Sequence, residues 1–442
     1  MRILFSAGEL DKELNANTKI VLQLAEYMAG KGHSVAVCGI CYYKPCDENY
    51  NGVILKKFSA PKAVVKASEA FEDFISTGDR NALRGVFIKK HPLKAVCLAA
   101  RYNAAYIEKA EQPSYLKQLK KFAGEFKPDV MVLPYKPINS FEKVVNSDVD
   151  VPMVAYQMDP WGLHRIDNEN GDVAVIEKEC AAFGKVKHIF TTPVLLRQYG
   201  ENELYKKYTD KMTAVDFPNV KSHREEDCAA ADTDAVETAQ TNKKAVKQTQ
   251  TENKSAIDFD KEYINILFGG VVADSFRSPE YALKALAPMF DSGEKIRIYF
   301  MGTNNSDVLD EYIKKYPQNV FFKEKVSADV ALATMKKADV LFNISNKIDN
   351  QVPSKIFDYF ALGKPILNLQ RIENCPAAEY FEKYPLVFSL KEWEQADITA
   401  LKKFLYDVND KKIDFKTVKE IYKSATVEYV AESMQNVFEN IN

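Results

Sequence analysis

Short apolar runs alternate with amphipathic stretches along the first half of the chain. Residues 2–6 form an apolar run, and a polar loop at 8–17 separates it from residues 20–28, whose apolar positions recur at helical spacing. A second apolar run follows at 34–39. This order predicts a β-α-β unit that opens a parallel sheet. Further strands are expected at 129–134, 152–156 and 188–192, with an amphipathic segment at 115–126.

The alternation is more regular in the second half of the chain. Strands are predicted at 264–268, 296–300, 319–322, 340–343 and 365–369. Helices are predicted between them at 279–288, 306–316, 328–338 and 354–362. Strict alternation of strands and helices is typical of a doubly wound parallel sheet. The amphipathic residues from about 415 to 440 predict a last helix that packs back on the first domain.

One segment interrupts this pattern and sets the predicted domain boundaries. Residues 221–255 contain no Leu, Ile, Met, Phe, Tyr or Trp, so they cannot bury enough apolar surface to offset chain entropy. We therefore expect a first domain at 1–215, a disordered linker or loop at 216–260, a second domain at 261–415 and a returning helix at 416–442.

Composition excludes several classes of protein. The 442 residues carry a net charge of −2, which argues against nucleic-acid binding through bulk charge. No signal peptide and no spanning helix are predicted, and seven cysteines are an odd number that fits reduced thiols in the cytoplasm. Cys38, Cys41 and Cys46 lack a matching second pair, so no metal site is expected. Phosphate-loop, dinucleotide, nucleophile-elbow and zinc-helix motifs are missing from the sequence.

The segment 352–367 carries the most information about function. Pro353 and Ser354 are typical of a helix start, and Gly363 followed by Pro365 is typical of a helix end. Free N–H groups at a helix start form an anion site, and Asp358 lies one turn further on, within reach of a hydroxyl beside that anion. Such an arrangement suits a nucleotide-sugar. An ordinary capped helix is the alternative interpretation.

Two further segments in the second half of the chain also follow predicted strands. Gly269 and Gly270 would let main chain approach a ligand, and Arg277 could fork onto a diphosphate. Ser345 ends another strand, where small polar groups suit phosphate or sugar hydroxyls. For both segments the alternative is a structural turn.

The loop after the strand at 152–156 combines an acid, an aromatic ring and a histidine. Asp159 could act as a base, and Trp161 could stack on a sugar ring, with His164 close by in the sequence. A loop with a capping Asp and an anchoring Trp is the alternative.

These motifs resemble those of GT-B glycosyltransferases, in particular the retaining, family-4-like group that includes surface polysaccharide and lipopolysaccharide sugar transferases. The likeness covers most of 1–40 and 264–370, through the opening strand and helix, the Gly32-His33 strand start, and the three donor-side segments above. It implies an α/β fold of two facing, doubly wound, Rossmann-like domains. The first domain would be on the acceptor side, and the second would bind the donor.

The resemblance also assigns roles to single residues. Arg277 would bind the diphosphate and take part in catalysis with Asp159. The other donor-binding residues would be Gly270, Gly302, Val326, Ser345, Ser354, Lys355 and Asp358, with Gly302 and Val326 beside the base and Asp358 on the ribose. The acceptor-side residues would be Asn15, Asn17, Trp161 and His164.

The chain departs from the family pattern at several places. Asn15 and Ala16 replace the usual paired glycines before the first helix, and Asp358 stands where the family has Glu. The first acid of the family's paired-acid motif should stand eight residues before Asp358, where this chain has Asn350. The lysine usual shortly after the arginine is missing; Lys284 falls mid-helix, and Lys347 is a candidate substitute.

We therefore expect a sugar transferase that uses a UDP- or GDP-linked donor with retention, a glycan or lipid-linked acceptor, and no cofactor. The basic and apolar residues 87–94 suit either a peripheral contact with the inner face of the plasma membrane or a solvated helix end. A non-catalytic nucleotide-sugar-binding subunit and a nucleotide-sugar epimerase of the same fold are the alternatives.

Overall fold

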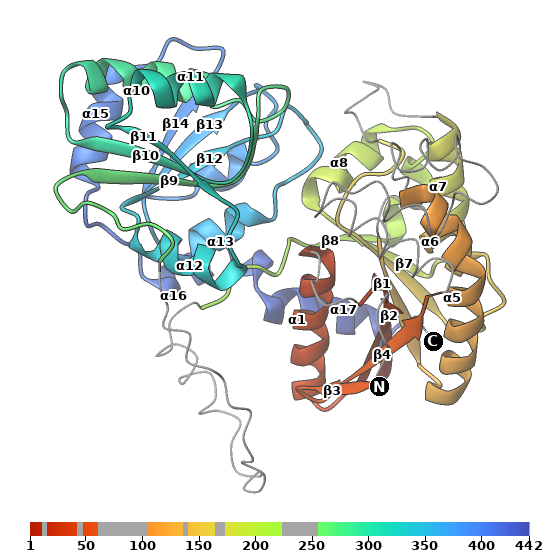
Figure 1. Ribbon diagram of the computed structural model, residues 1–442. Helices are drawn as coiled ribbons and strands as arrows, with labels where there is room; N and C mark the ends of the chain where they lie inside the picture. The colour runs from red at the N-terminus through yellow and green to blue at the C-terminus, as the bar shows by residue number, and fades with distance from the viewer. Residues whose placement is uncertain are drawn as a thin grey trace, which may run out of the picture. The chain divides into compact units, whose positions relative to one another are not determined.

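The computed structural model describes residues 1–10, 16–41, 47–60, 104–135, 140–163, 173–222 and 255–441. The chain divides into two compact units (Figure 1). The first unit comprises Met1–Pro218 together with Ser424–Asn442, and the second comprises Asn219–Lys423. Residues 87–94 and most of the segment 221–255 lie outside the described residues.

The first unit is built on sheet A, whose strand order is β3-β4-β2-β1-β5-β6-β7-β8. All neighbouring strands are parallel except the pair β3 and β4. The strands are β1 Arg2–Glu9, β2 Ser34–Cys41, β3 Glu48–Tyr50, β4 Val53–Ser59, β5 Val130–Tyr135, β6 Met153–Gln157, β7 His188–Thr191 and β8 Met212–Ala214. The five strands predicted here are confirmed, whereas β3, β4 and β8 were missed.

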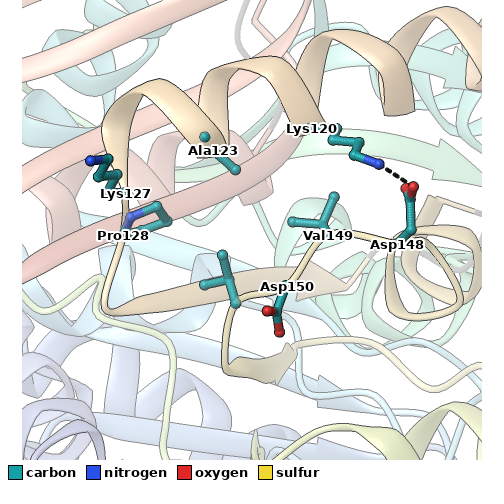
Figure 2. A pocket seen from close by; sticks show the side chains of 9 residues that line it. Lys120, Ala123, Lys127, Pro128, Asp148, Val149 and Asp150 are labelled. Carbon is teal, nitrogen blue, oxygen red and sulfur yellow. Dashed lines mark hydrogen bonds and ion pairs between the residues drawn. The ribbon is translucent and has the colours of Figure 1, made fainter.

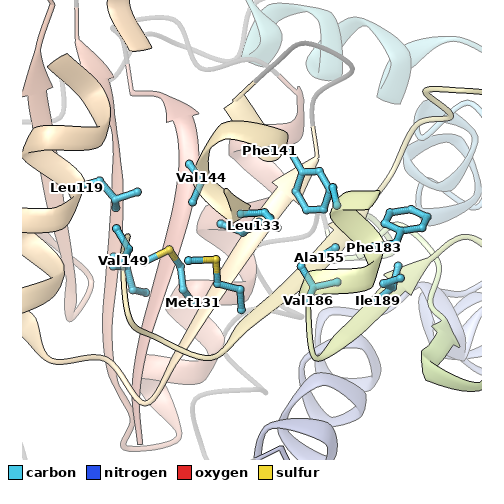
Figure 3. Packing of buried hydrophobic residues seen from close by; sticks show 14 of the residues in the cluster. Leu119, Met131, Leu133, Phe141, Val144, Val149, Ala155, Phe183, Val186 and Ile189 are labelled. Atoms are coloured by element: carbon cyan, nitrogen blue, oxygen red, sulfur yellow. The ribbon is translucent and has the colours of Figure 1, made fainter. Parts of the chain in front are cut away.

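Helices cover both faces of the centre of this sheet, so a central strand such as β6 is buried along its whole length, whereas the edge strand β3 is exposed. The helices are α1 Ala16–Gly30, α5 Ala104–Phe126, α6 Ser140–Val145, α7 Val173–Lys185, α8 Pro193–Glu201 and α17 Val427–Phe438, with a 3-10 helix η1 at Lys206–Lys211. On one face, Leu119 of α5, Met131 of β5, Phe141 of α6 and Phe183 of α7 pack into one core (Figure 3).

The second unit is built on sheet B, which is parallel throughout, in the order β11-β10-β9-β12-β13-β14. Its strands are β9 Ile264–Ala273, β10 Ile296–Asn305, β11 Val320–Glu324, β12 Val340–Ile344, β13 Ile366–Gln370 and β14 Val387–Lys391. Its helices are α10 Glu280–Asp291, α11 Asp307–Lys315, α12 Ala328–Lys337, α13 Lys355–Ala361, α14 Ala378–Glu382, α15 Ile398–Asp407 and α16 Phe415–Ile421. The predicted alternation and the doubly wound α/β fold class are confirmed.

The single helix predicted over about 415–440 is wrong. The chain forms α16, a 3-10 turn η3 at Lys423–Ala425, and then α17. The break has a local cause, because Thr426 takes up extended backbone and its hydroxyl accepts a hydrogen bond from Tyr429 N at 3.3 Å, which starts a new helix. The helix α17 packs on α1, where the Tyr27 hydroxyl donates to Glu432 at 3.2 Å.

Strands β9 and β10 run five residues past their predicted ends, and glycines make this extension possible. Gly270 and Gly302 are register partners, with φ of 157° and 148°. A Cβ atom on Gly302 would overlap the Gly270 carbonyl oxygen, which is main chain and cannot turn aside. The two strand ends can therefore pair only because position 302 lacks a side chain.

We expect Gly302→Ala to lower the free energy of unfolding by roughly 3 kcal/mol or more, because backbone strain and overlap combine. Gly293→Ala is the matched control in the same unit. Its φ is 75°, but a Cβ there meets nothing within 4 Å, so only the cost of left-handed backbone, about 1 kcal/mol, applies. Urea unfolding monitored by circular dichroism measures both. Equal losses in the two variants would contradict this account.

Candidate active site

The carboxyl ends of β9 and β12 mark the place where the strand order of sheet B reverses. Open parallel sheets bind ligands in the crevice at this edge. Gly269 and Gly270 lie near the end of β9, and Asn343 and Ser345 lie at the end of β12. The loop after β9 and the helix α13 bring charged groups to the same edge.

Arg277 is held over this edge by a turn. Its main-chain N–H donates to the Ala273 carbonyl at 2.8 Å, and its side-chain Nε donates to Asn346 Oδ1 at 2.7 Å. The side chain is half-buried, and burial lowers its pKa while Tyr359 acts in the opposite direction. The guanidinium is therefore fixed in position by the segment that follows β12.

Lys355, on the first turn of α13, is the second cation. Although the residue as a whole is exposed, its Nζ donates to the Gly269 carbonyl at 2.8 Å. Burial of the ammonium group and then the neighbouring Arg277 charge lower its pKa, and Asp358 opposes them. The charges of Arg277 and Asp358 thus both act on Lys355, and the structure brings these predicted donor-binding residues to the same edge.

Tyr359 fixes the same helix to the same glycine. Gly269 N donates to the Tyr359 hydroxyl at 3.3 Å, and the ring is buried. Burial raises the pKa of Tyr359 to about 12. A Cβ on Gly269 would lie 2.5 Å from the Met335 methyl, so a side chain here would require the end of the Met335 side chain to move.

Neither Lys284 nor Lys347, the candidate substitute for the family lysine, is recorded in contact with Arg277. Lys284 is exposed and pairs with Glu280 at 2.6 Å, one turn away on α10. Lys347 pairs with Glu392 at 3.8 Å. The lysine whose charge interacts with Arg277 is instead Lys355. Spacing in the sequence does not reveal this pair, because Lys355 belongs to α13 and is brought to the end of β9 by its hydrogen bond to Gly269.

The predicted cap at Ser354 is wrong. Ser354 has helical backbone, with φ −56° and ψ −26°, and its side chain makes no capping hydrogen bond. The N–H groups of Ile356 and Phe357 donate to the carbonyls of Pro353 and Ser354, at 3.2 and 3.3 Å. These two N–H groups are therefore already paired within the first turn. The positive charge at this edge comes mainly from side chains rather than from the start of the helix.

The other predicted donor-side residues line the same edge without forming one cluster. The Ser345 hydroxyl is buried and accepts from Arg371 N at 3.0 Å, which ties β12 to β13. Val326 is half-buried in the loop between β11 and α12, and Gly302 lies near the end of β10. Asn350, which replaces the family acid, is fully buried.

On the first unit, the structure joins a predicted acceptor-side residue, Asn17, to the predicted catalytic residue Asp159. Asn17, at the start of α1, donates from Nδ2 to Asp159 Oδ2 at 3.5 Å. Trp161 is half-buried and packs against the core of this unit. Asn15 and His164 lie outside the described residues.

Glu179 of α7 lies directly behind this loop and was missed by sequence reasoning. Its side chain is fully buried, and it accepts hydrogen bonds from Gln157 Nε2 at 2.6 Å, from Gly162 N at 2.9 Å and from the Tyr205 hydroxyl. Burial raises the pKa of Glu179 to about 7, and these donors lower it in part. One acid on a mid-helix position gives no signal in a sequence.

A hollow of about 380 Å³ lies at the edge of sheet A opposite the carboxyl ends of its strands (Figure 2). It is lined by the end of α5 and by residues that precede β5 and β6, among them Lys127, Pro128 and Asp150, and it is bordered by the ion pair of Lys120 with Asp148. These positions are at the amino ends of the strands, so the hollow is separate from the candidate site.

Among the described residues, no group of three or more His, Cys, Asp or Glu side chains is arranged to hold a metal ion. No helix in the part of the chain that the structure describes is long and apolar enough to cross a membrane.

Comparison with solved structures finds this two-domain architecture in several proteins. Sucrose-phosphate synthase from Thermosynechococcus elongatus aligns with a TM-score of 0.60 at 11% identity, over 100% of this chain and 98% of that one. A glycosyltransferase from Rickettsia africae gives 0.55 at 9% identity, over 100% and 98%. UDP-GlcNAc 2-epimerase from Methanocaldococcus jannaschii gives 0.51 at 10% identity, over 99% and 100%.

These likenesses show that the chain has the GT-B fold of two Rossmann-like domains. At such low identities they show the fold alone. No protein-family model matches the chain, and a comparison with curated proteins finds no match.

The raised pKa of Glu179 predicts how stability changes with pH. Glu179 binds its proton more tightly in the folded protein than in the unfolded chain. Its contribution to stability is therefore fully present below its ordinary pKa of 4.5 and is lost as pH rises through about 7. Relative to Glu179→Gln, the wild-type protein should lose roughly 3 kcal/mol of unfolding free energy over this range. Urea unfolding at several pH values measures the difference. Glu177→Gln, on an exposed position of α7, is the control and should follow the wild type.

Proposed function

We propose that this protein is a glycosyltransferase that moves a sugar from a nucleoside-diphosphate sugar to a glycan or lipid-linked acceptor. The observation that carries the proposal is the pair of cations, Arg277 and Lys355, at the glycine-rich carboxyl edge of sheet B. A planar guanidinium and a compact ammonium side by side suit the adjacent phosphates of a diphosphate. Lys355 uses one of its three N–H donors on Gly269, which leaves two for a ligand.

In this proposal the two cations act mainly on the leaving group. As the bond to the sugar breaks, negative charge builds on the departing diphosphate, and Arg277 and Lys355 are already fixed to receive it. Prior fixing matters because no reorganisation is then needed during the reaction. Asp358, which raises the pKa of Lys355, would stand beside the ribose, and Gly302 and Val326 beside the base.

The acceptor would bind at the loop after β6. Asp159 is oriented by Asn17 and could accept a proton from the attacking hydroxyl, and Trp161 offers a ring face to a sugar. We further propose that the anomeric centre keeps its configuration, that the donor is UDP- or GDP-linked, and that the product belongs to a surface polysaccharide made at the inner face of the plasma membrane. No step in this proposal needs a metal ion.

A non-catalytic nucleotide-sugar-binding subunit is the second candidate. The observation that favours it is Asn350, a buried amide where the resembled family has an acid. A nucleotide-sugar epimerase is a third, supported by the fold that it shares with the chain.

A thermal-shift panel of UDP, GDP, ADP, CDP and dTDP tests the donor site. A nucleotide that binds only the folded state at one hundred times its Kd adds about 2.7 kcal/mol of stability. We expect one nucleotide to raise the Tm of the wild type, and Arg277→Ala and Lys355→Ala each to abolish that shift. Lys284→Ala and Lys347→Ala are the controls and should keep it. If no nucleotide shifts the wild type, the donor-site assignment is wrong.

Turnover of the donor separates the three candidates. With the matching nucleotide-sugar and no acceptor, a transferase should release nucleoside diphosphate and free sugar slowly, and Arg277→Ala should reduce this rate at least a hundredfold, on the order seen when one donor to a developing charge is removed. Nucleotide detection and proton NMR of the sugar follow both products. Binding without release would favour the non-catalytic subunit, and an epimerised sugar would favour the epimerase.

A further inference from the structure

Glu179 clamps both ends of the loop that carries Asp159 and Trp161. Gln157 stands just before the four residues 158–161 and donates to Glu179 Oε1 at 2.6 Å. Gly162 stands just after them, and its main-chain N–H donates to Glu179 Oε2 at 2.9 Å. One buried carboxyl therefore fixes the point where the chain leaves β6 and the point where it turns back toward the core.

The glycine of this clamp has no substitute. A Cβ atom on Gly162 would overlap the Tyr205 hydroxyl and would lie 2.6 Å from Ile176 Cγ1 and 2.8 Å from Ile176 Cα. The main chain at 162 can therefore approach Glu179 only when position 162 is glycine. Tyr205 completes the arrangement from the far side, because its hydroxyl donates to the same Oε2.

The groups around Glu179 stay neutral near neutral pH. Tyr199 of α8 and Tyr205, which precedes η1, both have a pKa raised well above their ordinary value, first by burial and then by the Glu179 charge. Burial raises the pKa of Cys180, the next residue on α7, to about 11. Gln157 and the Gly162 N–H do not titrate. Among these groups, only Glu179 changes its charge between pH 5 and 9.

Protonation removes the cost of burying a charge, which stabilises the unit as a whole, but it weakens the hydrogen bonds of the clamp on one side. The ionised carboxylate accepts from both ends of the loop through charge-assisted hydrogen bonds, which are roughly twice as strong as neutral ones. A proton on Oε1 turns that oxygen into a donor that faces the Gln157 amide N–H₂, so the amide must rotate before its oxygen can accept. Among the described residues the Gln157 amide oxygen has no hydrogen-bond partner, so it can take this role.

We infer that Glu179 is the positioning residue of the acceptor-side loop, holding Asp159 and Trp161 in place when ionised and loosening them when protonated. Its function in transfer rests on the proposed glycosyltransferase activity, whereas its effect on the loop does not. The loop would then be best ordered above neutral pH.

Trp161 reports on the loop directly. The chain has two tryptophans, Trp161 and Trp393, so Trp393→Phe leaves a single probe inside the clamped segment. We expect its emission to titrate with a midpoint near pH 7, and Glu179→Gln in the same background to give a flat profile. Tyr205→Phe removes one donor to the ionised form and should move the midpoint to higher pH. Circular dichroism confirms that each variant is folded.

Glu177→Gln is the matched control on α7 and should titrate as the parent does. His164 is retained in every variant, so a titration that survives in Glu179→Gln belongs to another group and overturns the inference. A parent protein whose Trp161 emission does not change between pH 5.5 and 8.5 overturns it as well.

The transfer reaction provides the second readout. Glu179→Gln should leave the Arg277-dependent nucleotide thermal shift unchanged, because the donor site lies in the other unit. It should lower kcat/KM for the acceptor by up to about a hundredfold, the scale of loss when a reacting group is misplaced, and remove the rise of that constant through neutral pH. A normal nucleotide shift with unaltered acceptor kinetics would refute the role in transfer. Loss of nucleotide binding in the wild type would refute the proposed function instead, while the fluorescence test would still decide the clamp.

Discussion

Close approach of main chain to main chain at the carboxyl edge of sheet B is the constraint on which the candidate donor site depends. The Gly270 carbonyl occupies the space that a side chain on Gly302 would need. Gly269 leaves its own main chain open to Lys355 and Tyr359 of α13. A larger residue at position 302 would force the ends of β9 and β10 apart. The cations are therefore positioned by the absence of side chains, which rigid parallel strands make possible.

The first unit positions its loop by a different means. There a buried carboxyl, Glu179, gathers donors from the end of β6, from the following loop and from Tyr205. Burial of an ionisable group is costly unless it is hydrogen-bonded, and here the cost is expressed as a pKa close to neutrality. Glycine serves both sites, because Gly162 brings a main-chain N–H to the carboxyl as closely as Gly269 brings a carbonyl to Lys355.

Local patterns predicted some parts of these sites and failed for others. Arg277 was found because it follows a glycine turn and precedes Pro279, a signal contained in a few consecutive residues. The side-chain cap at Ser354 was wrong because its backbone is helical, whereas a capping residue needs extended backbone to reach the N–H groups of the first turn. Lys347 was suggested from the sequence as a substitute for the family lysine, but it pairs with Glu392, while the charge of Lys355 interacts with that of Arg277 from another element.

The sequence by itself determined the alternation of strands and helices, the two parallel sheets and the edge at which polar residues gather. Burial of strands on both faces leaves continuous apolar runs, and those runs are visible without coordinates. Only the tertiary structure decided which side chains meet there. The contacts of Lys355 with Gly269, of Asn17 with Asp159 and of Glu179 with Gly162 join residues from different elements, some far apart in the chain. Their distances follow from how helices pack on a twisted sheet, which local periodicity does not encode.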